Sequence, residues 1–142
     1  MTIGGAFRGI FTAGQSSDII LDNVTIDNVC YTFNSDDGNK TYALIAKNST
    51  FNGWTSYSNN FSAVSFTDCT FGAGTGGYKY AFCRPYNTST FTGCVFEEGF
   101  EFDATCATST FVNCYYGDIL ITQENVATLL GASAANVIVV NN

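Results

Sequence analysis

Hydrophobic and polar residues alternate in five short segments of the chain that follow one template. In each, a short alternating stretch leads to Asn, Asp or Gly, and a second alternating stretch follows. Such alternation is typical of a strand with one buried face. Asn, Asp and Gly tolerate left-handed backbone angles, so one of them can bend the chain and keep both apolar faces inward. The segments are IILDNVTI (19–26), LIAKNSTF (44–51), VSFTDCTF (64–71), STFTGCVF (89–96) and STFVNCYY (109–116).

The spacing of these segments predicts a solenoid. The bend residues are Asn23, Asn48, Asp68, Gly93 and Asn113, at intervals of 25, 20, 25 and 20 residues. A fixed period in this range indicates repeats that bury their apolar faces against their neighbours. Stacking the repeats in register gives three inward columns. These are Leu21, Ala46, Phe66, Phe91 and Phe111; Val24, Ser49, Cys69, Cys94 and Cys114; and Ile26, Phe51, Phe71, Phe96 and Tyr116.

A third strand is expected in each return segment. Residues 78–82 and 99–103 both alternate and align at a spacing of 20, which pairs Tyr80 with Phe100 and Phe82 with Phe102. The longer intervals then need five extra residues in a turn, for which 36–40 and 72–77 are candidates. We therefore predict an all-β fold, a right-handed single-stranded parallel β-helix of about five coils over residues 1–121.

Residues 122–142 are expected to cap the last coil within the same single domain. Thr122 is a plausible N-cap residue, and Val126, Leu129 and Leu130 form one apolar helical face. Gly131 is a natural helix stop. Residues 136–140 are then expected to form a final strand.

The motifs FTDCTF, FTGCVF and KNSTFNG resemble the parallel β-helix repeats of the pectin-lyase-like superfamily, over about residues 3–121. The resemblance implies right-handed coils of three strands. It does not select a function, because this superfamily includes lyases, hydrolases, tailspikes and adhesins. The chain has no His and so departs from the polygalacturonase-type hydrolases, whose motifs include one.

Charge narrows the expected partners. The chain has 12 acidic and 5 basic residues, a net charge of −7. Nucleic acid and anionic membranes attract basic surfaces, so neither is an expected partner. No apolar run reaches the length of a membrane-spanning helix. Residues 1–11 are too short for a secretion signal and contain Arg8. We expect part of a longer secreted or cell-surface protein, or a module whose N-terminal end contacts further coils or another chain. A complete small cytoplasmic protein is the alternative.

Cysteine spacing predicts no metal site and no cofactor. The six Cys lack the paired short spacings of zinc sites, and three of them occupy one inward column as small buried side chains. Disulfides between adjacent coils stay open as an alternative. The segment Asp36-Asp37-Gly38-Asn39 suggests a calcium loop only superficially, because it lacks the alternate ligand spacing. A β-turn at Gly38 is the expected structure.

Two groups of residues are candidates for a functional site. Glu101 and Asp103, with Lys79 and Arg84 one coil earlier, could perform acid–base chemistry on a sugar or form an exposed ion-pair surface. Aromatic residues beside short polar ones could form a sugar-binding platform or pack under the turns. The aromatic candidates are Trp54 and Tyr57, in an expected turn, and Tyr78 and Tyr86, which flank the third strand.

Three functions remain open at this point. The leading hypothesis is a non-catalytic extracellular module that binds polysaccharide or mediates adhesion. The second is a polysaccharide lyase or glycoside hydrolase that acts on acidic glycans. The third is a structural spacer without a ligand.

Overall fold

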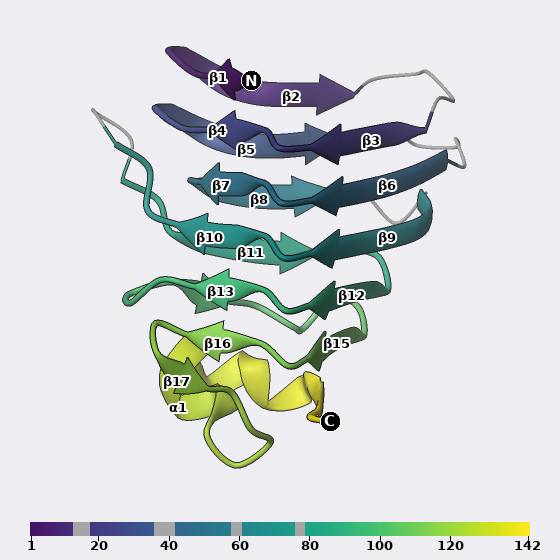
Figure 1. The fold of residues 1–142 in the computed structure, drawn as a ribbon, viewed down its shortest axis with the longest axis vertical. Helices are drawn as coiled ribbons and strands as arrows, with labels where there is room; N and C mark the ends of the chain where they lie inside the picture. The colour runs from purple at the N-terminus through teal and green to yellow at the C-terminus, as the bar shows by residue number, and fades with distance from the viewer. Residues whose placement is uncertain (13–17, 36–41, 58–60, 76–78) are drawn as a thin grey trace.

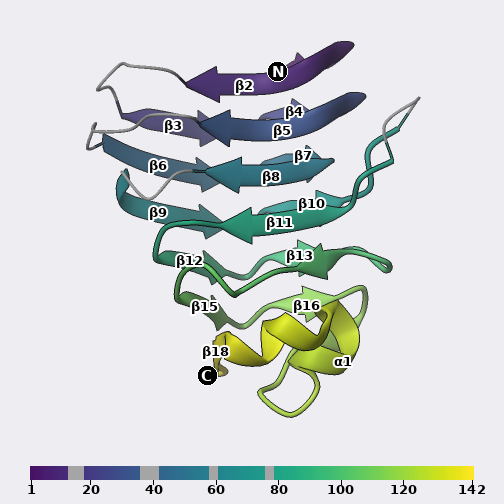
Figure 2. The same ribbon diagram turned by 180° about the vertical axis from the view of Figure 1, so that it is seen from behind.

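The chain forms a parallel β-solenoid in the computed structural model, which describes residues 1–12, 18–35, 42–57, 61–75 and 79–142 (Figure 1). In Figure 1 the five-stranded sheet, which begins with β2 (Ala6–Thr12), runs behind the other two sheets, and in Figure 2 it lies in front. The chain passes behind to the right, returns in front to the left and descends one strand per turn, which makes the coil right-handed. The predicted fold class is confirmed.

Three sheets form the walls of the solenoid. The six-stranded sheet contains β3 (Ile19–Asp22), β6 (Tyr42–Lys47), β9 (Phe61–Thr67), β12 (Ser89–Thr92), β15 (Ser109–Val112) and β18 (Ile138–Val140). The seven-stranded sheet contains β1 (Thr2–Ile3), β4 (Thr25–Ile26), β7 (Thr50–Asn52), β10 (Thr70–Gly72), β13 (Val95–Phe96), β16 (Tyr115–Tyr116) and β17 (Ile119–Leu120). The five-stranded sheet contains β2 (Ala6–Thr12), β5 (Val29–Ser35), β8 (Trp54–Tyr57), β11 (Phe82–Pro85) and β14 (Glu101–Phe102). Within the described residues this makes four complete coils, from β3-β4-β5 to β12-β13-β14, and a partial coil at each end.

The predicted bend residues all adopt the left-handed conformation. Their φ angles are 55° at Asn23, 50° at Asn48, 52° at Asp68, 63° at Gly93 and 51° at Asn113. Backbone hydrogen bonds continue through the bends, since the amide of each bend residue donates to the next coil at 2.8–3.2 Å. The short polar residues required at these positions therefore set the angle between the six- and seven-stranded sheets.

The three predicted inward columns are present. Paired strands align Phe66, Phe91 and Phe111 in one column, and Phe51, Phe71 and Phe96 in another. The Phe66 and Phe91 rings stack at 4.9 Å between centroids with 14° between their planes. All six side chains are buried, so the repeated Phe positions form a continuous hydrophobic core along the axis.

The column of thiols lies beside the Phe columns. Cys69, Cys94 and Cys114 are buried and form no disulfide. Each Sγ donates to backbone carbonyls, for example from Cys114 to Phe91 O at 3.2 Å. Hydrogen bonds to Cys114 and Cys69, together with burial, raise the pKa of the Cys94 thiol. The column thus supplies small apolar side chains in a narrow part of the core.

The third strand of each coil differs from the expected arrangement. β11 begins at Phe82, and it pairs with β14 at a spacing of 19, which aligns Phe82 with Glu101 and Cys83 with Phe102. The predicted pairs of Tyr80 with Phe100 and Phe82 with Phe102 are therefore wrong. The inward position is taken by Cys83, and Phe82 points outward. The reason is that a strand with apolar residues on both faces does not reveal by its pattern which face is buried.

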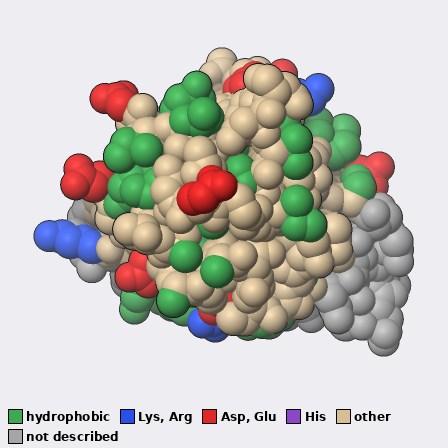
Figure 3. Space-filling view, turned by 90° about the horizontal axis from the view of Figure 1, so that it is seen from below, with side chains coloured by type: hydrophobic (Ala, Val, Ile, Leu, Met, Phe, Trp, Pro, Cys, Tyr) green, Lys and Arg blue, Asp and Glu red, His purple; other side chains and the backbone are tan. Residues whose placement is uncertain are grey.

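The C-terminal segment caps the last coil, with boundaries that differ slightly from the prediction. The helix α1 covers Val126–Leu130 and is followed by a 3₁₀ helix at Ala132–Asn136. The assigned helix begins at Val126, which puts Asn125 at the N-cap position. Thr122 nevertheless forms the hydrogen bonds predicted for an N-cap: its Oγ1 accepts from the Asn125 amide at 3.3 Å, and Asn125 Oδ1 accepts from the Thr122 amide at 2.7 Å. Figure 3 views this end and shows hydrophobic side chains as separate groups among polar atoms. Val126 and Leu130 are buried beneath this surface.

Residues 36–41 and 76–78 lie outside the described residues, and with them the predicted turn at Gly38 and the candidate Tyr78.

Candidate functional site: an aromatic groove on the five-stranded sheet

Aromatic side chains line the outer face of the five-stranded sheet. On β8, Thr55 and Tyr57 are buried inside the coil, and Trp54 lies on the opposite face of the strand. Trp54 pairs with Tyr31 of β5 on one side and with Phe82 of β11 on the other. We call this set of rings the aromatic row; it consists of Phe7, Tyr31, Trp54, Tyr80 and Phe82.

Ring contacts connect the aromatic row across successive coils. Phe7 and Tyr31 are 5.5 Å apart between ring centroids, and Tyr31 and Trp54 are also 5.5 Å apart. Trp54 then meets Phe82 at 4.8 Å and Tyr80 at 5.6 Å, both edge-on. Phe7 and Tyr80 stay about half exposed, at 51% and 47%. The row therefore follows the axis of the solenoid and leaves ring surface in contact with solvent.

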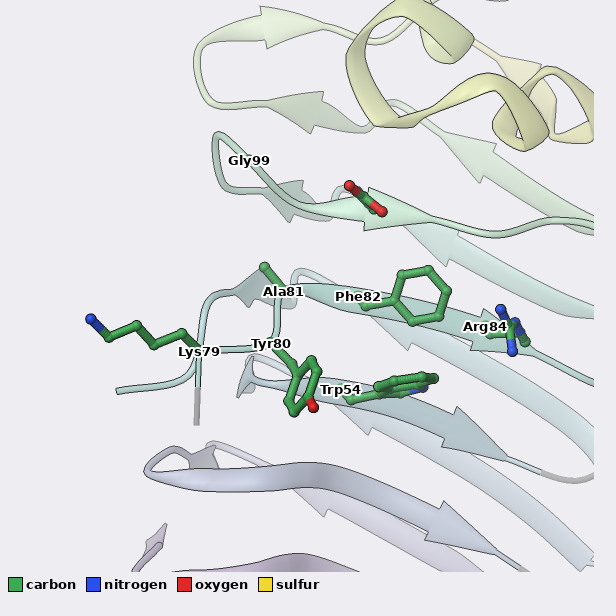
Figure 4. Close-up of a pocket in the computed structure, with 8 residues that line it drawn as sticks. Trp54, Lys79, Tyr80, Ala81, Phe82, Arg84 and Gly99 are labelled. Atoms are coloured by element: carbon green, nitrogen blue, oxygen red, sulfur yellow. The ribbon is translucent and has the colours of Figure 1, made fainter. Parts of the chain in front are cut away.

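A groove of about 460 Å³ lies at the C-terminal end of the aromatic row (Figure 4). Trp54, Tyr80 and Phe82 supply its rings, and Arg84 and Glu101 are its charged members on β11 and β14. Figure 4 shows the side chains of Trp54, Tyr80 and Phe82 gathered together, whereas Lys79 extends away from them. Gly99 and Ala81, the remaining lining residues, add little bulk. A flat apolar platform with a few polar groups at its margin is suited to binding a ligand with an apolar face.

Arg84 is held firmly at one margin of the groove. Its Nε donates to Asp103 Oδ2 at 2.8 Å, and its guanidinium lies 5.2 Å from the Phe82 centroid and 5.9 Å from that of Trp54. Hydrogen bonds with Tyr86 and Asp103 raise the pKa of Arg84. The guanidinium thus has a paired charge and two aromatic neighbours.

Asp103 is equally occupied. Its Oδ1 accepts from Thr105 Oγ1 at 2.6 Å and from the Thr105 amide at 3.0 Å. The hydrogen bonds from Thr105 and the ion pair with Arg84 outweigh partial burial and lower the pKa of Asp103. A carboxyl group that stays ionised in this way is a poor proton donor near neutral pH.

Among the described residues, Glu101 has no ionic partner, unlike Asp103. Glu101 is exposed and lies opposite Phe82 in the strand register. Among the described residues, the only ion pair is that of Arg84 with Asp103. A carboxylate at the margin of an aromatic platform is therefore available to accept hydrogen bonds from a ligand or to pair with a positive charge.

The groove brings together four of the predicted site residues: Trp54, Lys79, Arg84 and Glu101. Asp103 joins it through Arg84, as expected from their positions in the stack. Tyr86 is 41% exposed and bonds Arg84 beside the groove. The role of these residues in binding or catalysis stays a prediction.

Tyr57 requires a correction as a ligand-binding candidate. It lies on β8 and not in a turn, and its side chain is 1% exposed. Its hydroxyl forms a hydrogen bond of 2.6 Å with Ser89 Oγ inside the coil. Trp54 also lies on β8 and not in a turn, but on the outer face of the strand. Period-two alternation in WTSY could have separated these two residues once the segment was recognised as a strand.

Sequence reasoning missed the other members of the aromatic row. Tyr80 and Phe82 were considered only as partners of the buried Phe100 and Phe102, and Phe7 and Tyr31 were not considered. Arg8 was missed as well; its guanidinium lies 5.9 Å from the Tyr31 centroid and 4.9 Å from that of Phe11. The outward placement depends on pairing between strands 19 to 28 residues apart, which no local pattern contains.

In the described part of the chain, no three His, Cys, Asp or Glu side chains come together as a set of metal ligands. The same part has no helix with the length and apolar character needed to cross a bilayer.

Comparisons with protein-family models, with curated proteins and with solved structures find no match to this chain.

Proposed function

We propose that the protein is a non-catalytic binding module for polysaccharide, and that the ligand lies along the aromatic row. The observation that carries the proposal is the line of rings across successive coils, which ends in the groove formed by Trp54, Tyr80 and Phe82. A polymer of sugars has a repeated apolar face, and a row of rings offers it repeated platforms.

The polar groups at the groove support a ligand with hydroxyl groups. The Glu101 carboxylate is a potential hydrogen-bond acceptor in the groove, and the Arg84 side chain, which also lines it, forms a hydrogen bond with Tyr86. Hydrogen bonds of this kind orient a ligand that the rings hold by contact area. Binding through a long, open surface also suits a polymer, because several weak contacts add along one chain.

Catalysis is less favoured by this arrangement. Lyase or hydrolase chemistry on an acidic glycan requires a group that gives or takes a proton at the reacting sugar. Asp103 is tied to Arg84 and Thr105, and its pKa is lowered. Lys79 extends away from the rings (Figure 4). Enzymatic turnover is therefore kept as an outcome of the test and not as a second proposal.

The location of the protein and the contacts of its first strands are part of the same proposal. The resemblance of the repeat motifs to the pectin-lyase-like superfamily favours a secreted or cell-surface protein, where polysaccharide is available. The first strands β1, β2 and β3 form one edge of the three sheets, and we propose that further coils or another chain pair with this edge.

The test is a binding screen of the folded protein against insoluble and soluble polysaccharides, followed by calorimetry on the ligands found. Tyr80→Ala removes an exposed ring from the groove, and we expect it to weaken binding about threefold to tenfold. Tyr115→Ala is the matched control, because Tyr115 is 41% exposed on β16 of the seven-stranded sheet. It should leave binding unchanged.

Three outcomes would count against the proposal. Binding that is insensitive to Tyr80→Ala would show that another surface holds the glycan. Release of reducing or unsaturated ends, abolished by Glu101→Gln or Asp103→Asn, would show an enzyme. The absence of binding across the screen would favour a structural spacer.

A further inference from the structure

We infer that the polysaccharide bound by the groove carries free amino groups, so that an ammonium group lies between the aromatic rings and Glu101. This inference rests on the proposed function and adds the chemical class of the ligand. It depends on which charges of the groove are already paired and which are available.

The rings of the groove already hold one cation. The Arg84 guanidinium carbon lies 5.2 Å from the Phe82 centroid and 5.9 Å from that of Trp54. At the other end of the aromatic row, Arg8 is placed in the same way, 5.5 Å from Phe7 and 5.9 Å from Tyr31. The negative potential of an aromatic face attracts positive charge. Both ends of the row thus show that these faces accept cations.

The positive charge of Arg84 is already paired with a carboxylate of the protein. Its Nε pairs with Asp103 at 2.8 Å, and Tyr86 takes a further hydrogen bond. A uronic acid in the groove would have to share the Arg84 guanidinium with Asp103 or rely on Lys79, whose side chain extends away from the rings (Figure 4). The groove therefore offers a carboxylate ligand little compensation for the loss of its hydration.

The negative charge of Glu101 is available. Glu101 lines the same groove as Trp54, Tyr80 and Phe82 and has no ion pair within the described residues. An aromatic corner closed by a carboxylate is the arrangement that holds alkylammonium groups, since the rings and the acid attract the same charge. The net charge of −7 acts in the same direction at longer range, because it attracts a polycation and repels a polyanion.

The experiment compares two oligosaccharides that differ only in charge. Calorimetry on the full chain measures binding of a glucosamine hexasaccharide and of its fully N-acetylated counterpart at the same pH and salt. We expect the glucosamine hexasaccharide to bind at least about tenfold more tightly than its N-acetylated counterpart. Raising the salt concentration should reduce that preference, because it screens the charge. Oligogalacturonate of the same length should bind most weakly.

Glu101→Gln then tests the residue itself. The change keeps the shape and removes the charge, and we expect about threefold to tenfold weaker binding of the glucosamine oligomer and little change for the N-acetylated one. Glu124→Gln is the matched control, because Glu124 is an exposed acid beyond β17 in the C-terminal cap. It alters the net charge equally and should leave the preference intact.

The failures of the two proposals are distinguishable. Equal binding of the two oligosaccharides, or tighter binding of oligogalacturonate, would overturn the ammonium inference and leave polysaccharide binding standing. Hexalysine that binds as tightly as the glucosamine oligomer, with the same loss in Glu101→Gln, would also overturn it, since the groove would then recognise charge without sugar. Absence of binding to every oligosaccharide would overturn the proposed function itself.

Discussion

Most strands of the six- and seven-stranded sheets keep a constant register, with one shift between Tyr42 and Ala43 of β6, whereas the five-stranded sheet changes from coil to coil. Strands β7, β10 and β13 keep the aromatic position in register, as do β9, β12 and β15. In the five-stranded sheet the register shifts between Tyr31 and Phe33, and the spacing of β11 and β14 is 19 residues. The six- and seven-stranded sheets thus form a regular scaffold, and the five-stranded sheet forms an irregular wall.

The outer surfaces of the two regions differ in the same way. In the middle of the six-stranded sheet the outward column contains Ser65, Thr90 and Thr110, which are small and polar. Toward the two ends of the sheet the same column contains Ile20, Ile45 and Ile138. On the five-stranded sheet the outward residues are large rings and charged groups. This difference indicates that the repeated inward columns supply most of the stability of this fold. The surface of the irregular sheet can then differ in each coil at little structural cost.

Phe91→Ala should produce the largest effect on this comparison. Phe91 is buried at the centre of the aromatic core and stacks on Phe66. Its loss leaves a cavity, and we expect the free energy of unfolding to fall by about 3–5 kcal/mol. Urea denaturation followed by circular dichroism measures the change.

Tyr80→Ala serves as the control for Phe91→Ala, because it removes a half-exposed ring from the irregular wall. We expect a loss of about 1 kcal/mol or less. Equal losses for the two variants would contradict the division into a stabilising wall and a variable wall.

Asn48→Ala should have an intermediate effect, through the bend and not through the core. Asn48 has a φ angle of 50°, a conformation that costs an ordinary residue about 1–2 kcal/mol. Its Nδ2 also donates to Asp22 Oδ1 at 3.1 Å. We expect a loss of about 1–2 kcal/mol in urea denaturation. Asn48→Gly, which accepts the angle, should lose clearly less, and similar losses for the two would remove the bend argument.

Asp103→Asn should produce the smallest effect on stability, and that effect should depend on pH. The pKa of Asp103 in the folded state is lowered from 3.8 by Thr105 and Arg84. The carboxylate therefore contributes stability above pH 4 or so, and this contribution is lost as the pH falls through the lowered value. At neutral pH we expect a loss of about 1 kcal/mol or less, because the pair is partly exposed.

Thermal unfolding between neutral and acidic pH measures this contribution. The wild-type protein should lose more stability on acidification than Asp103→Asn does. Some acid dependence should remain in the variant. Although partial burial raises the pKa of Asp27, hydrogen bonds from Asn28, Thr75 and Asn52 lower it overall. Identical pH profiles for the two proteins would show that the Arg84 pair does not stabilise the fold.

Most of the scaffold could be predicted from local sequence patterns. Asn23, Asn48 and Asp68 could be placed at bends because few residue types accept a left-handed backbone angle, and this restriction is local. The Phe and Cys columns followed, because a fixed spacing stacks like on like when repeats are in register. The C-terminal helix was also recognisable, from Val126 and Leu130 on one face and Gly131 at its end.

The groove, in contrast, depends on strand pairing that local patterns do not specify. Phe82 and Cys83 are both apolar, so the local pattern does not say which points outward, and a shift of one residue exchanges them. Likewise, the sequence pattern did not show that the Tyr57 side chain is buried and that the Tyr80 side chain is about half exposed. The groove combines side chains of three coils. Because Arg84 pairs with Asp103, Glu101 is left without an ion pair among the described residues. Contacts between residues far apart in the chain depend on strand register. In the five-stranded sheet the spacing of the strands varies, so their register depends on how the side chains of successive coils pack together.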